Sequence, residues 1–90
     1  MKNLYEAFLE IKTESEFNAL LMDLCTPSEI SALNERWKIA QILYEGKLSQ
    51  REIASKLNVS ITTVTRVARF LNNENYKGYL TLLNRMHHHA

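Results

Sequence analysis

Two threonines and two arginines near the middle of the chain recur at a spacing that an α-helix would bring together. Thr62, Thr65, Arg66 and Arg69 are separated by intervals of three and four residues, so they would share one helix face. In the DNA major groove, arginine can bond guanine bidentately, and threonine can bond a base or contact the thymine methyl group. The spacing therefore indicates a helix that reads DNA.

A second polar group precedes this face in the sequence. Ser49, Gln50 and Arg51 open another helical pattern, and the free backbone amides and positive dipole at a helix start attract phosphate. Lys47 and Lys56 would add attraction that does not depend on the DNA sequence. We expect contacts of this kind to position the protein, whereas base contacts select the site.

The charge of the chain is unevenly distributed. The formal net charge is only +1, which is too small to indicate a nucleic-acid binder by itself. However, residues 1–30 hold two lysines against six acidic side chains, whereas residues 47–71 hold five basic side chains against one acidic. The basic region therefore coincides with the segment that carries the polar face.

Capping signals locate the helices that must carry these groups. Thr13, Thr26 and Ser49 are each followed three residues later by glutamate, which is the pattern of a capping box, and Ser60 can cap the next helix. The turn between the helices that Ser49 and Ser60 cap falls at Asn58 and Val59. We expect six helices: one around residues 4–11, one after Thr13, one from Pro27 to Gly46, one after Ser49, one from Ile61 to about Leu71, and a last one carrying Tyr76, Tyr79, Leu80, Leu82 and Leu83.

The β-branched residues of VSITTVTRV are the main argument against a helix from Ile61, since such residues favour strands. Strict alternation fails, because Val64 and Val67 are three residues apart, and Ala68 and Leu71 continue the helical period. These four residues would form an apolar face nearly opposite the threonines and arginines. The period therefore predicts a helix with one packing face and one exposed polar face.

Composition favours an all-α protein. The 90 residues include only two glycines and one proline, which leaves few turns for a sheet. We expect one helical domain over residues 1–86, and a tail over residues 87–90 whose three histidines suggest a tag remnant or a frayed end. The helix ending near Gly46 has apolar residues on more than one stripe, so it is either very central or covered by a second copy of the chain.

The same features argue against other classes. A lone cysteine, Cys25, excludes an internal disulfide framework and is best explained as a small buried residue. No leader or spanning-length apolar run is present, so we expect a cytoplasmic protein that does not bind membranes. We expect no enzyme and no metal site, because no acid–base pair, metal-ligand spacing or phosphate loop is visible.

The segment from Thr26 to Arg66, TPSEISALNERWKIAQILYEGKLSQREIASKLNVSITTVTR, resembles the central block of the tryptophan repressor family. The similarity lies in the Thr-Pro opening, an arginine in the middle of the third helix, the motif LSQRE and the start ITTVTR of the fifth helix. It implies a six-helix, intertwined homodimer with a helix-turn-helix at about residues 49–71, whose two copies reach successive major grooves of double-stranded DNA about 34 Å apart.

The resemblance also implies roles for individual residues. Arg51 is expected to contact a base directly, and Gln50 and Thr65 to position the DNA backbone. The residues expected on the DNA side are Gln50, Arg51, Ile61, Thr62, Thr63, Thr65 and Arg66, to which the charge pattern adds Arg69, Lys47 and Lys56.

The chain departs from the family at the tryptophan pocket. Arg36 and Arg66 match the two arginines that flank the bound amino acid, and Thr26 and Thr63 match further pocket positions. The residue after the second arginine is glycine in tryptophan-binding members, but here it is Val67.

The residue three positions after Val67 departs as well, because the small serine of the family is replaced by Phe70. Glycine inside a helix costs roughly 0.5–1 kcal/mol relative to alanine, so it is kept where a ligand must approach closely. We therefore expect Val67 and Phe70 to fill the corepressor volume, so that the protein binds DNA without tryptophan or another cofactor.

Two alternative functions remain open. In the first, a different small molecule regulates the protein, and Arg36 and Arg66 hold its carboxylate between subunits. In the second, the chain is a helical dimer that binds a protein partner and uses its helix-turn-helix for packing. A steep loss of DNA affinity with salt would separate a DNA binder from the second alternative.

Overall fold

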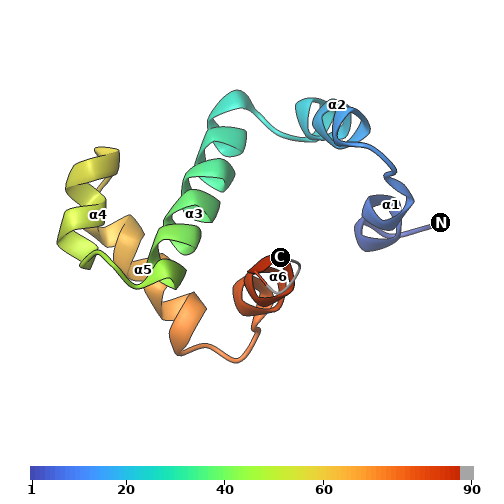
Figure 1. The fold of residues 1–90 in the computed structure, drawn as a ribbon. Helices are drawn as coiled ribbons and strands as arrows, with labels where there is room; N and C mark the ends of the chain where they lie inside the picture. The colour runs from blue at the N-terminus through green and yellow to red at the C-terminus, as the bar shows by residue number, and fades with distance from the viewer. Residues whose placement is uncertain (88–90) are drawn as a thin grey trace. The chain divides into compact units, whose positions relative to one another are not determined.

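The computed structural model describes residues 1–87, which form six α-helices and no strand. This confirms the all-helical class predicted from composition. In Figure 1 the helices are α1 (Leu4–Glu10), α2 (Glu14–Leu24), α3 (Pro27–Glu45), α4 (Gln50–Leu57), α5 (Ile61–Asn72) and α6 (Gly78–His87).

The chain divides into two compact units, and the boundary between Leu33 and Asn34 falls within α3. The first unit holds α1, α2 and the start of α3. Thr13 caps α2, as the sequence predicts, and Asn3 forms a capping box with Glu6 at the start of α1, which we did not predict. The rings of Phe8 and Phe17 lie 5.1 Å apart between their centroids. Most other large apolar side chains of this unit are exposed in the single chain.

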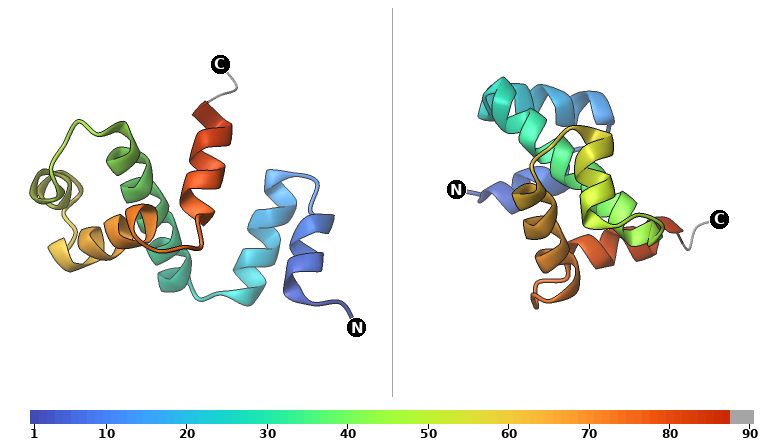
Figure 2. Two further views of the ribbon diagram at one scale, coloured as in Figure 1. Left: turned by 90° about the horizontal axis from the view of Figure 1, so that it is seen from below. Right: turned by 90° about the vertical axis from the view of Figure 1, so that its left-hand side faces the viewer.

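The second unit builds a small apolar core around the part of α3 that follows Asn34. Figure 2 shows α4, α5 and α6 gathered about this part of α3. Trp37 and Tyr79 pack against the core and stack on one another, with ring centroids 6.2 Å apart. The buried cluster consists of Ile39, Ala40, Ile53, Val64, Val67, Leu71 and Leu83.

Left-handed residues end two of the helices. Gly46 follows α3 with a φ of 73°, a conformation that glycine adopts without steric cost. Asn58 follows α4 with φ 55° and ψ 49°, and the amide of Val59 bonds back to the carbonyl of Ala54 at 3.0 Å. Asparagine tolerates this conformation better than most residues, so the sequence itself specifies the short turn between α4 and α5.

The last helix begins later than we predicted. Tyr76 was expected within it, but α6 starts at Gly78, because Lys77 has a φ of 59° and a left-handed residue does not continue a right-handed helix. Tyr76 lies in the connection, where its side chain is 81% exposed. His87, which we assigned to the tail, is the last residue of α6, and its ring lies 4.9 Å from that of Tyr44. His88 and His89 lie outside the described residues.

Candidate nucleic-acid interface and adjoining pocket

The start of α4 is fixed by a reciprocal capping box. The hydroxyl of Ser49 accepts a hydrogen bond from the amide of Glu52 at 3.1 Å, and the carboxylate of Glu52 accepts one from the amide of Ser49 at 2.9 Å. The amide of Ser49, and after it the hydroxyl, lowers the pKa of Glu52 below its ordinary value. Gln50 and Arg51 follow directly and are exposed, so this helix start can be reached by an anionic partner.

The two faces of α5 separate as the spacing predicts. Val64, Val67, Ala68 and Leu71 are buried against the core. On the other side, Ile61 is 45% exposed, and Thr62, Thr65, Arg66 and Arg69 are exposed as well.

The cap of α5 includes Thr63, which we expected to face DNA and to line the ligand pocket. The amide of Thr63 donates to the Ser60 hydroxyl at 3.2 Å, and the two side-chain hydroxyls lie 2.9 Å apart. Thr63 is not among the residues that line the pocket described below. Its roles toward DNA and ligand stay predictions.

A hydrogen bond joins the two helices on their exposed side. The hydroxyl of Thr65 donates to the side-chain oxygen of Gln50 at 2.9 Å. We expected both residues on the DNA side, but nothing in the sequence pattern predicted that they contact one another. Lys47 and Lys56 are also exposed in this unit.

The arginines of α5 lie over an aromatic ring, a contact that we did not predict. The guanidinium carbon of Arg66 is 4.5 Å from the ring centroid of Phe70, and that of Arg69 is 4.8 Å from the same centroid. Nε of Arg69 also lies 3.9 Å from a carboxylate oxygen of Glu74. The i, i+4 spacing of Arg66 and Phe70 is the sequence signal that could have indicated the first contact.

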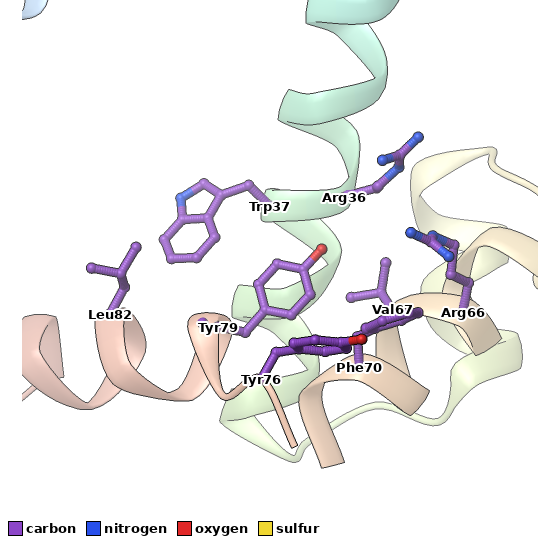
Figure 3. A pocket seen from close by; sticks show the side chains of 9 residues that line it. Arg36, Trp37, Arg66, Val67, Phe70, Tyr76, Tyr79 and Leu82 are labelled. Carbon is purple, nitrogen blue, oxygen red and sulfur yellow. The ribbon is translucent and has the colours of Figure 1, made fainter. Parts of the chain in front are cut away.

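A pocket of about 420 Å³ lies beside α5, where Arg66, Val67 and Phe70 line it (Figure 3). Four residues that the sequence assigned to a ligand site line it together: Arg36, Arg66, Val67 and Phe70. Trp37, Tyr76 and Tyr79 supply most of the remaining wall, so the pocket combines two guanidinium groups with aromatic rings. In Figure 3 the side chains of Arg36 and Arg66 lie on the same side of these rings.

The remaining predicted pocket residue, Thr26, belongs to the first unit. Its hydroxyl accepts from the amide of Glu29 at 3.2 Å, and its own amide donates to the Glu29 carboxylate at 2.8 Å. These contacts lower the pKa of Glu29 and start α3 at Pro27. The structure thus gives Thr26 a capping role, and its ligand role stays a prediction.

Residues 1–87 contain no metal-ligand cluster and no membrane-spanning helix. No cluster of three or more histidine, cysteine, aspartate or glutamate side chains is placed to hold a metal ion in this part of the chain. Nor does any helix of the described chain have the length and apolar character needed to cross a membrane.

The fold and the site define an all-helical protein that exposes a basic helix pair. A family model described as Trp repressor protein matches residues 1–87. The chain belongs to the Trp repressor family.

Individual relatives agree with this assignment. A Trp operon repressor homolog from Xylella fastidiosa (strain M23) is 40% identical over 80 residues, which cover 84% of this chain and 87% of that protein. An uncharacterized protein, YerC, from Bacillus subtilis (strain 168) is 33% identical over 75 residues, covering 83% and 71% of the two chains. The crystal structure of a TrpR like protein from Eubacterium eligens has a TM-score of 0.84 and 34% identity, covering 93% of this chain and 84% of that one.

Proposed function

We propose that the protein is a sequence-specific, DNA-binding transcriptional repressor that acts as a homodimer and does not need tryptophan. In this proposal α4 and α5 form a helix-turn-helix, and α5 enters the major groove. The observation that carries it is the division of α5 into a buried apolar face and an exposed face of threonines and arginines, on a helix joined to α4 by the three residues 58–60.

The charges of the helix pair support this proposal. The exposed side chains of Lys47, Arg51, Lys56, Arg66 and Arg69 belong to one short segment that contains a single acidic residue, Glu52. Because the carboxylate of Glu52 is held by its own helix cap, it can ionise there without approaching the arginines of α5. Phosphate contacts from such a segment would make DNA affinity fall steeply with salt.

Exposed apolar side chains support the homodimer. Monomeric proteins seldom expose many large apolar residues, and a homodimer that covers them would carry two α5 helices, one from each copy. The exposed large apolar residues of the first unit are Met1, Leu4, Tyr5, Leu9, Phe17, Met22, Leu24 and Leu33. Sedimentation at micromolar concentration should therefore give the mass of a dimer.

The side chains of α5 support independence from tryptophan. Val67 is only 1% exposed and belongs to the core, so its methyl groups narrow, without closing, the pocket of about 420 Å³ that they line, whereas a glycine would leave this space open. Phe70 adds a half-buried ring one turn further along. We infer that these two side chains hold α5 in its binding position, as a corepressor does in tryptophan-dependent members.

Selection from a random duplex library tests the proposal directly. At ~0.15 M salt, specific binding should exceed non-specific binding by ~10³ or more, with and without tryptophan. An enriched inverted repeat that is indifferent to tryptophan is the expected result, and a promoter carrying that repeat should be less active when the protein is present. Enrichment only with tryptophan would contradict the tryptophan-independent mode, and no enrichment would contradict DNA binding itself.

One observation favours a second function, regulation by another small molecule. The pocket beside α5 has two guanidinium groups, Arg36 and Arg66, and no acidic residue among those that line it. Guanidinium groups bind carboxylates strongly through paired hydrogen bonds, and the aromatic walls suit an apolar body. A thermal shift caused by an apolar carboxylic acid, but not by its amide, would support this second function.

A further inference from the structure

One aromatic ring on α5 contacts both arginines of the exposed face. The guanidinium carbons of Arg66 and Arg69 lie 4.5 Å and 4.8 Å from the ring centroid of Phe70, within the range of a cation–π interaction. Arg66 precedes the ring by one helical turn, where contact is expected. Arg69 is the residue next to Phe70, and adjacent helix residues do not face one another, so its long side chain must bend over the ring.

The ring is itself held from the connection between α5 and α6. Tyr76 stacks on Phe70 with centroids 6.2 Å apart and an angle of 20° between the ring planes. Such a distance is typical of offset stacking between aromatic side chains. Tyr76 is 81% exposed, so this stacking is a specific contact at the surface rather than part of the apolar core.

The ring restrains the arginines without neutralising them. A carboxylate partner would offset their charge toward DNA, but a ring does not. Within residues 1–87, Arg66 forms no ion pair, whereas Arg69 forms a long one, with 3.9 Å between its Nε and a carboxylate oxygen of Glu74. An arginine that is already ordered loses less conformational freedom when it binds a phosphate or base. The stack therefore presents two ordered guanidinium groups on the face that we expect to meet DNA, and Arg66 is the one whose charge no carboxylate offsets.

We propose that Phe70 is a positioning residue for DNA recognition, whose ring pre-orders Arg66 and Arg69 on the exposed face of α5. This inference rests on the proposed DNA-binding function and adds a role that the sequence resemblance does not assign. Phe70 acts through the two arginines and does not itself need to contact DNA. The ring therefore raises the affinity for DNA by ordering the two arginines, and it does not change the number of positive charges on the face.

Two substitutions distinguish the effect of the aromatic ring of Phe70 from the effect of its apolar volume. Phe70→Met keeps a similar apolar volume but removes the ring, and it should weaken specific DNA binding by about tenfold. Phe70→Tyr keeps the ring and should bind within about twofold of the wild type. The salt dependence of Phe70→Met should keep the wild-type slope, because no charge is lost, whereas Arg66→Gln should reduce the slope by about one.

A double-mutant cycle shows whether Phe70 acts through Arg66. In an Arg66→Gln background, the effect of Phe70→Met should shrink to about threefold, since only Arg69 remains over the ring. An undiminished effect would overturn the inference, as would equal losses in Phe70→Met and Phe70→Tyr. If the wild type binds a selected site and Phe70→Met binds it equally well, the inference fails while the proposed function stands. If the wild type shows no specific binding, both fail.

A measurement on the unmutated protein covers the case in which Phe70→Met does not fold. Nitrogen-15 relaxation of the arginine Nε groups reports their order in the free protein. Arg66 and Arg69 should be more ordered than Arg51, an exposed arginine on α4 that has no ring contact within residues 1–87, and Arg66 is the decisive comparison because Arg69 is also paired with Glu74. Equal mobility of the Nε groups of Arg66 and Arg51 would overturn the inference independently of any DNA measurement.

Discussion

The hydroxyl of Thr65 on α5 donates a hydrogen bond to the side-chain oxygen of Gln50 at the first turn of α4, with 2.9 Å between the two oxygens. The bond joins residues 15 positions apart and lies on the exposed side of the helix pair. It therefore fixes how the start of α4 lies against α5 on the surface that we expect to face DNA, while the apolar core fixes the opposite side.

Removing this bond should affect DNA binding more than folding. Thr65→Val keeps the shape of the side chain but removes the hydroxyl, so the free energy of unfolding should change by less than about 1 kcal/mol, as is usual for an exposed hydrogen bond. Specific DNA affinity should fall by roughly five- to tenfold, because both partners are then free to leave their binding position. Urea unfolding and a binding titration measure the two quantities.

A matched control is available on α6. Thr81→Val also removes a hydroxyl, one that donates to the carbonyl of Lys77, and it should leave DNA affinity unchanged. Gln50→Leu should match the loss seen in Thr65→Val, and the double variant should be little worse than either. Full additivity of the two losses would show that the residues act separately and would contradict the coupling.

Enlarging the pocket beside α5 by removing the Val67 side chain should cost stability. Val67→Gly removes a core side chain and adds a glycine to α5, so the free energy of unfolding should fall by roughly 2–4 kcal/mol. Calorimetry should find tryptophan binding in Val67→Gly, or in Val67→Gly with Phe70→Ser, but not in the wild type. A dissociation constant below ~100 µM for the wild type would contradict our explanation of tryptophan independence.

Local signals predicted most of the fold. The helix starts after Thr13, Thr26, Ser49 and Ser60 followed from caps whose partners are three residues away, and the period of α5 correctly outweighed its β-branched composition. The predicted start of α6 was wrong, because a lysine gives no sign that Lys77 is left-handed. At Asn58 the residue type does give such a sign, since asparagine tolerates that conformation.

The sequence predicted which helix face belongs to the candidate site, but it did not predict the contacts between side chains there. Helical spacing identified the exposed side of α5. The family resemblance assigned Arg36 and Arg66 to one ligand site, and both line the same pocket. The bond between Thr65 and Gln50 depends on the crossing of two helices, and the stack of Tyr76 on Phe70 depends on the path of a connection. Neither is encoded in a local pattern, so only the three-dimensional structure reveals them.

The turn between α4 and α5 should tolerate glycine better than alanine. Asn58 has a φ of 55°, where a side chain with a Cβ atom costs about 1–2 kcal/mol unless it bonds locally. Asn58→Ala should therefore lower the free energy of unfolding by about 1–2 kcal/mol, whereas Asn58→Gly should stay within about 0.5 kcal/mol of the wild type. Thermal or urea unfolding measures both, and equal losses would show that the backbone conformation is not the cause.

The cap of α4 should make stability depend on pH. The pKa of Glu52 is lowered by the amide of Ser49 and then by its hydroxyl, so folding favours the ionised carboxylate. This contribution is complete above the ordinary pKa of 4.5 and is lost as the pH falls through the lower pKa of the folded state. Glu52→Gln should therefore be less stable than the wild type at pH 7, and the difference between the two should shrink steadily as the pH is lowered from 5 to 3.

Salt separates this local effect from the general charge of the chain. At ~0.5 M salt, long-range charge interactions are screened, but a hydrogen bond within one helix cap remains. The difference in unfolding free energy between the wild type and Glu52→Gln should then keep its dependence on pH. If that dependence disappears at high salt, net charge is the cause, and the cap does not account for the stability of α4 at neutral pH.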